Sequence, residues 1–163
     1  MDRLTFDRTY YTLREEFDTT SATLVDLEGL SLPITIDELA LGILLYRFEV
    51  HLSFSTLMSG ESGYAGVAFS VTGPSASNVA YTYRCPLDDS NETVKNCVVY
   101  GQPDTASAST VWGVNVASII GTLTPFEDGE LQVVCACDGV NTLQVLPGSY
   151  MFVEGVNPYR WDT

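Results

Sequence analysis

Few residues in this sequence have the type and spacing that chemistry requires, and its single histidine is the first to consider. His51 lies in the run Tyr46-Arg-Phe-Glu-Val-His-Leu-Ser-Phe54, on the polar side of a segment that alternates apolar and polar residues. A catalytic triad or a zinc site needs further ligands or partners of matching type. With no second histidine in the chain, we interpret His51 as a surface or interface residue of a strand.

The four cysteines form no C-x-x-C pair, which argues against a zinc knuckle or a thioredoxin-like site. Cys135 and Cys137 are two residues apart, so a strand places both thiols on one face, as small buried hydrophobes. Cys85 and Cys97 flank a polar loop, and a disulfide closing it would contribute up to about 3 kcal/mol. A reducing cytoplasm would keep these thiols free, so the sequence leaves this disulfide open.

Two acidic turns carry oxygen ligands of the kind that calcium prefers, but neither has the EF-hand spacing. They contribute Asp88, Asp89, Asn91 and Glu92, and then Glu127, Asp128 and Glu130. Because acidic turns on β proteins are usually solvated, we predict neither a metal site nor a cofactor.

The sequence contains no nucleophile elbow, phosphate-binding loop, H-E-x-x-H or glycine-rich dinucleotide turn. We therefore predict no enzymatic activity. A carboxylate-based hydrolase acting on surface polysaccharide is kept as a weaker hypothesis, because a pair of facing carboxylates needs no motif.

The elements that would position these residues are strands. Apolar residues alternate with polar or small ones in five segments, which predicts strands with one buried face. Their apolar positions are Tyr46, Phe48, Val50, Leu52 and Phe54; Val67, Phe69 and Val71; Val79, Tyr81 and Tyr83; Leu131, Val133, Cys135 and Cys137; and Leu143 and Val145. Turn signals separate them. The sequence predicts an all-β, single-domain β-sandwich over residues 23–163.

The first 22 residues have a different pattern. Phe6, Tyr10, Leu13 and Phe17 are spaced 4, 3 and 4 apart, which is typical of one side of a helix. A helix this short is marginal alone, so we expect an extended or short-helical arm over residues 1–22 that orders against something else. The alternative is a helix or strand folded back on its own domain.

The net charge of −14 excludes nucleic acid as a natural partner, because such a surface repels phosphate. The charge is uneven: residues 1–14 hold three arginines and two aspartates, a net of +1, whereas residues 15–163 hold four basic and 19 acidic residues, a net of −15. No run of about 18 apolar residues or signal-peptide core occurs, so we expect neither a membrane span nor secretion.

Six short runs resemble a jelly-roll domain of structural proteins from tailed bacteriophages, which is similar in layout to trimers of the tumour-necrosis-factor type. The runs are Gly29-Leu-Ser-Leu-Pro-Ile, Tyr46-Arg-Phe-Glu-Val, Gly66-Val-Ala-Phe-Ser-Val-Thr-Gly-Pro74, Ile119-Ile-Gly-Thr-Leu-Thr-Pro125, Asp128-Gly-Glu-Leu131 and Pro147-Gly-Ser-Tyr-Met-Phe-Val153. The resemblance covers about residues 24–156 and implies a jelly-roll homotrimer on a virion.

From these observations we expect a capsid decoration or cement protein, assembled in the host cytoplasm, that binds the major capsid protein at the surface of the particle. We expect the arm to dock through Arg3, Phe6, Arg8, Tyr10, Tyr11, Leu13 and Arg14, because aromatics and arginine dominate interface energetics. Deleting residues 1–20 should then abolish binding and leave a folded trimer. The alternative is a tail or head-fibre module that binds a receptor or glycan through Tyr81, Tyr83, Tyr100 or Trp112.

Overall fold

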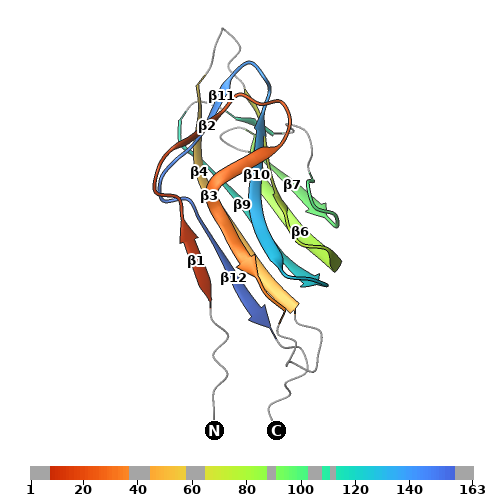
Figure 1. Ribbon diagram of the computed structural model, residues 1–163. Coiled ribbons are helices and arrows are strands. Elements are labelled where there is room, and N and C mark those ends of the chain that lie inside the picture. Colours follow the sequence, from red (N-terminus) through yellow and green to blue (C-terminus); the bar gives the residue numbers. More distant parts are fainter. Residues whose placement is uncertain are drawn as a thin grey trace.

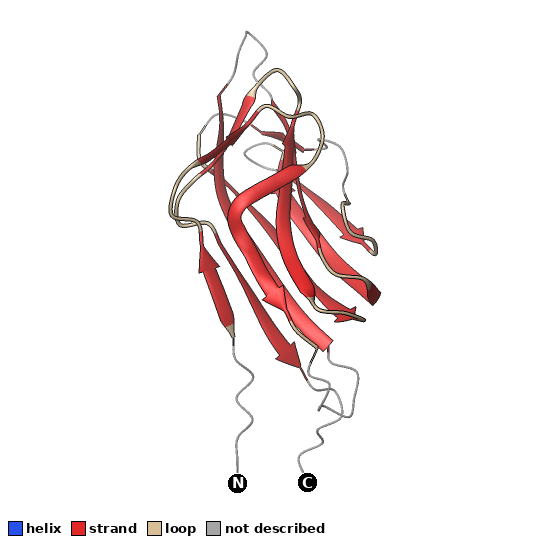
Figure 2. Ribbon diagram, viewed as in Figure 1, coloured by secondary structure: helices blue, strands red, loops and turns tan. Residues whose placement is uncertain are grey.

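The computed structural model describes residues 8–36, 45–57, 65–87, 91–102, 108–110 and 113–156, which form twelve strands and no helix (Figure 2). The strands are β1 (Thr9–Thr12), β2 (Phe17–Thr19), β3 (Val25–Ile34), β4 (Leu45–Leu57), β5 (Ala65–Thr72), β6 (Ala76–Pro86), β7 (Glu92–Cys97), β8 (Ala108–Thr110), β9 (Asn115–Pro125), β10 (Gly129–Cys137), β11 (Thr142–Val145) and β12 (Tyr150–Val156). The described part of the chain accordingly holds no helix that could cross a membrane.

The strands form two antiparallel sheets packed face to face, so the predicted β-sandwich is confirmed (Figure 1). Sheet A has the order β1-β12-β4-β9-β6-β7, and β11 and β2 extend it where β11 pairs with β4. Sheet B has the order β3-β10-β5-β8.

The strand pairs follow the nested order of a jelly roll, in which the first strand pairs with the last and so on inward. The nested pairs among the described strands are β1 with β12, β2 with β11, β3 with β10, β4 with β9, β5 with β8 and β6 with β7. The innermost pair, β6 and β7, joins sheet A beside β9.

The alternation read from the sequence places the core correctly. Tyr46, Phe48, Val50, Leu52 and Phe54 on β4 are all buried. The apolar positions predicted on β5, β6, β10 and β11 are buried as well. Facing side chains of the two sheets meet in this layer, for example Phe54 of β4 and Phe69 of β5, whose rings pack edge to face at 5.0 Å.

Of the two conformations expected near the N-terminus, extended or short-helical, the residues that the structure describes take the extended one. Residues 9–12 form β1 against β12, and residues 17–19 form β2 against β11. The run Thr-Tyr-Tyr-Thr has high strand propensity, and the edge of sheet A supplies hydrogen bonds that a short helix in water lacks. Residues 8–19 therefore belong to the sandwich itself, as in the alternative of a segment folded back on its own domain.

The pairing of β3 with β10 is irregular over residues 27–30. Between Gln132 and Val134 of β10, the register on β3 jumps from Ser31 to Asp26, which marks a bulge. The Gln132 amide donates to the carbonyl oxygens of Leu27 and Leu30, at 2.9 and 3.1 Å. Gly29 takes a positive φ of 85° within this bulge.

The turn between β10 and β11 is held by one carboxylate. Asp138 accepts hydrogen bonds from the backbone N–H groups of Asn141, Val140 and Gly66 and from the Asn141 amide, at 2.7 to 3.3 Å. Burial raises the pKa of Asp138, but these donors lower it more, so its pKa lies below its ordinary value.

This arrangement predicts a pH-dependent stability contribution. A carboxyl group with a depressed folded-state pKa stabilises the fold above its unfolded pKa of about 4, and this contribution is lost as pH falls through the folded pKa. Asp138→Asn should therefore be less stable than the wild type at pH 7, with a smaller difference at pH 3, in urea unfolding at both values. An equal difference at the two pH values would contradict this assignment.

Candidate functional site: a groove beside the N-terminal strand

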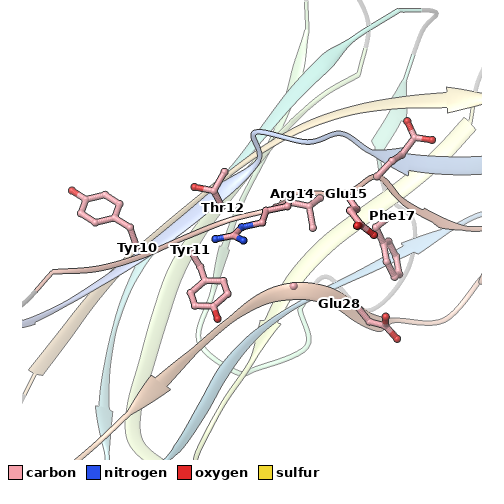
Figure 3. Close-up of a pocket in the computed structure, with 10 residues that line it drawn as sticks. Tyr10, Tyr11, Thr12, Arg14, Glu15, Phe17 and Glu28 are labelled. Atoms are coloured by element: carbon pink, nitrogen blue, oxygen red, sulfur yellow. The ribbon is translucent and has the colours of Figure 1, made fainter.

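A groove of about 780 Å³ lies between the N-terminal segment and β3, and we term it the N-terminal groove (Figure 3). It is lined by Tyr10 to Phe17 on one side and by Glu28 and Gly29 on the other. Two sheets contribute to it: β1 ends the described path of sheet A, and β3 ends that of sheet B. A strand at the end of a sheet has backbone groups that are not used by the ladder and are open to a partner.

The two tyrosines of β1 point to opposite sides of the strand (Figure 3). Tyr10 lies opposite Phe152 in the register, and their rings pack at 5.4 Å on the outer face of sheet A. Tyr11 lies opposite Met151, a core residue, and therefore turns toward β3 and the groove. Both remain accessible, with 55% and 50% of their surface exposed.

Leu13 anchors the segment to the body. It is 4% exposed and belongs to the core cluster. Its N–H donates to the Ser149 carbonyl at 2.7 Å, and its carbonyl accepts from Gly148 N–H at 3.0 Å. A Cβ added to Gly29 would lie 3.3 Å from Leu13 Cδ1, so this side chain reaches the bulge of β3.

The described residues of the groove are predominantly acidic, and their one cation forms no ion pair with another described residue. Glu15, Glu16 and Glu28 line it together with Arg14, which gives a local net of −2. Arg14 extends back along β1 in the direction of Tyr11 (Figure 3). Four ion pairs form among the described residues, and none of them includes Arg14. Its guanidinium is thus available to a carboxylate or an aromatic ring of a partner.

The structure divides the seven residues predicted for docking. Tyr10, Tyr11 and Arg14 all border the groove, but the Tyr10 ring packs against Phe152 on the other side of β1. Arg8 is engaged by its own domain, with Nε 3.2 Å from Glu154 and the guanidinium 5.5 Å from the Phe152 ring centroid. Leu13 is a core residue, so its predicted role in docking is wrong. Arg3 and Phe6 lie outside the described residues.

The cysteines form no reactive site. All four thiols are free and buried. The open question of a Cys85–Cys97 disulfide is resolved by the register: Cys85 is opposite Thr93 and Cys97 is opposite Tyr81. Four positions along a strand separate the two cysteines by about 13 Å, far beyond the reach of a disulfide. Cys135 and Cys137 are small buried hydrophobes, as predicted.

Two of the aromatics proposed for stacking on sugars are core residues instead. Tyr81 and Tyr83 are 3% and 0% exposed. Burial raises the pKa of Tyr81 to about 12, and its hydroxyl donates to the Val99 carbonyl and accepts from Gln102 N–H, both at 3.0 Å. Tyr100 is partly buried against the core, and Trp112 lies outside the described residues.

Among the described residues no three histidine, cysteine, aspartate or glutamate side chains are placed to hold a metal ion. The three acidic residues of the second turn have separate hydrogen-bond donors. Asp128 accepts from Ile36 N–H at 2.6 Å, Glu127 from Ser75 N–H at 3.3 Å, and Glu130 from the Ser31 hydroxyl. Of the first turn, Asp88 and Asp89 lie outside the described residues.

His51 stacks on Tyr150 at 4.9 Å, with Nε2 3.5 Å from a Glu49 oxygen.

Glu28 and Phe17 complete the groove, and sequence reasoning missed both. Glu28 is far from β1 in the chain, and only the pairing of β1 with β12 and the bulge in β3 bring it near.

The sequence matches no protein-family model, and no curated protein matches it.

Proposed function

We propose that this chain is a structural subunit of a tailed-phage particle, a trimeric decoration protein that binds the capsid shell through the N-terminal groove. The observation that carries the proposal is that an exposed Tyr11 on β1 and Arg14, which forms no ion pair among the described residues, line one groove on a segment that Leu13 anchors in the body. Tyrosine and arginine held in place beside a concave surface have the composition of interface hot spots.

The resemblance to phage jelly-roll proteins supports the choice of partner. Its six runs fall on β3, β4, β5, β9, the start of β10 and β12, so they sample both sheets and not one local motif. In this function the subunit bridges neighbouring coat proteins and adds buried area between them, which strengthens the shell against the pressure of packaged DNA.

Substitutions test this function better than a deletion of residues 1–20. That deletion removes β1 and β2 together with Leu13, and so damages the sheet as well as the groove. Tyr11→Ser and Arg14→Ser leave the backbone pairing in place. Each should weaken binding to undecorated capsids about 30-fold, because a hot-spot residue contributes about 2 kcal/mol.

The measurement is the fraction of purified protein that sediments with undecorated capsids over a range of concentrations. Phe126→Ser is the matched control, since Phe126 is an exposed aromatic in the turn after β9 and does not line the groove. The proposal predicts that the control binds like the wild type. Unchanged binding by both groove variants, or no binding by the wild type, would exclude this function.

The alternative, a receptor- or glycan-binding module of a tail or head fibre, predicts a different outcome of the same series. The wild type would then bind host cells but not capsids, and Tyr11→Ser would reduce binding to cells, because an exposed aromatic ring in a groove lined by carboxylates can stack on a sugar.

A further inference from the structure

The outer face of sheet A collects exposed apolar side chains, unlike any other surface formed by the described strands. Six of them lie on β1, β4, β7, β9 and β12 and point away from sheet B; they are Tyr10, Leu57, Val94, Val116, Ile120 and Tyr150. In contrast, no exposed valine, leucine, isoleucine, phenylalanine or tyrosine lies on β3, β5 or β10 of sheet B. We term this surface outer face A.

Along the six-strand path from β1 to β7, outer face A carries no net charge, in a strongly acidic protein; Asp18 of β2 lies beyond this path. Arg8, Arg47 and Arg84 lie on it, and each pairs with a glutamate of the same face: Glu154, Glu49 and Glu92 respectively. The path of six strands from β1 to β7 thus carries three positive and three negative charges on this side, whereas the chain carries −14. The strands β3 and β10 carry Asp26, Glu28 and Glu130 and no basic residue.

Several other side chains of outer face A are small. The register places Ser118 beside His51, Thr122 beside Arg47 and Ala80 beside Thr122. A strand of 11 residues such as β9 extends about 36 Å, and neighbouring strands are about 4.8 Å apart. The six strands, of which β1 and β7 are short, therefore present roughly 800 Å², about the area that each partner buries in a standard interface.

We propose that outer face A is the surface through which copies of this chain pack against one another. Two copies with a charge of −14 each repel, so close contact requires a face whose own charges are balanced. A basic partner would instead bind the acidic surfaces, such as the groove and sheet B. The apolar side chains supply the driving force for association, and exposed patches of this kind mark interaction sites. This inference specifies the trimer contained in the proposed function and rests on it.

The test is the mass of the purified chain by light scattering as a function of concentration. The wild type should have a mass that is a multiple of 17.8 kDa, three times this value for a trimer. Ile120→Lys and Val116→Lys, measured as separate variants, place a charge on β9, an inner strand of outer face A, where the native side chains are 41% and 58% exposed. Each should shift the mass toward that of the monomer.

Val140→Lys is the matched control, because it makes the same change of charge at an exposed valine in the turn between β10 and β11. It should keep the wild-type mass. Thermal unfolding of all variants shows whether they fold, and Val116, the more exposed position, keeps the test valid should Ile120→Lys unfold.

A monomeric wild type, or folded lysine variants with the wild-type mass, would overturn the inference. Failure of the proposed function is distinguishable from this result: an oligomer that dissociates on Ile120→Lys but never binds capsids supports outer face A and excludes the decoration function. The groove variant Tyr11→Ser should leave the mass unchanged.

Discussion

Replacing Gly121 with alanine is expected to lower the free energy of unfolding by about 3 kcal/mol, at the upper end of the cost of overpacking a core. Gly121 lies in the middle of β9, between β4 and β6. An added Cβ would be 2.5 Å from the Ala80 carbonyl oxygen and from Tyr81 Cβ, and 2.7 Å from Phe48 Cζ. Two of these atoms belong to or adjoin the backbone, so a rotamer change cannot relieve the clash.

Thermal unfolding followed by circular dichroism should show a decrease in Tm of roughly 6–12 °C for a loss of this size in a domain of this length. Gly148→Ala is the control, because Gly148 has a positive φ of 92° and open space around its Cβ position. It should cost only about 1 kcal/mol, the conformational penalty of a non-glycine residue there. A larger decrease in Tm for Gly148→Ala than for Gly121→Ala would contradict the close packing of β6 against β9 at Gly121.

The strands that could be predicted from the sequence are those in which buried apolar residues alternate with polar or small ones. β4 is the best case, since every second residue from Tyr46 to Phe54 is apolar and buried. β9 was missed because its outward side chains include Val116 and Ile120, which hide the alternation of Ala117, Ile119 and Leu123. On the interpretation given above, those same two side chains are exposed because they serve an interface.

The N-terminal groove could not be predicted from the sequence, because it depends on pairing between distant segments. The helical spacing of Tyr10, Leu13 and Phe17 has a different origin in the structure: these residues lie on β1, in the connection and on β2. Tyr11 and Arg14 were identified by residue type alone. Tyr10 and Arg8 instead pack on the other side of β1, against residues of β12. The register of β1 on β12 determines this difference, and no local sequence pattern indicates that register.

The second large effect concerns the anchor of this segment. Leu13→Ala should lower the free energy of unfolding by about 3 kcal/mol, since a buried leucine truncated to alanine leaves a cavity and costs about 2–5 kcal/mol. Leu13 packs in the core, and its backbone bonds to Ser149 and Gly148 tie the N-terminal segment to the turn before β12. The measurement is urea unfolding at pH 7, with the midpoint and slope compared with those of the wild type.

Tyr11→Ala is the matched control, because it truncates a half-exposed side chain two positions away on the same segment. It should change stability by less than about 1 kcal/mol but weaken capsid binding, whereas Leu13→Ala should do the reverse when binding is measured at a temperature where the variant is folded. An unchanged unfolding midpoint for Leu13→Ala would mean that the N-terminal segment contacts the sandwich without contributing to its stability. It would then act as the separable arm expected from the sequence, and a deletion of residues 1–20 would again be a clean test of docking. A loss of stability instead makes the segment a strand of the body, so that the body itself holds Tyr11 and Arg14 in place for a partner.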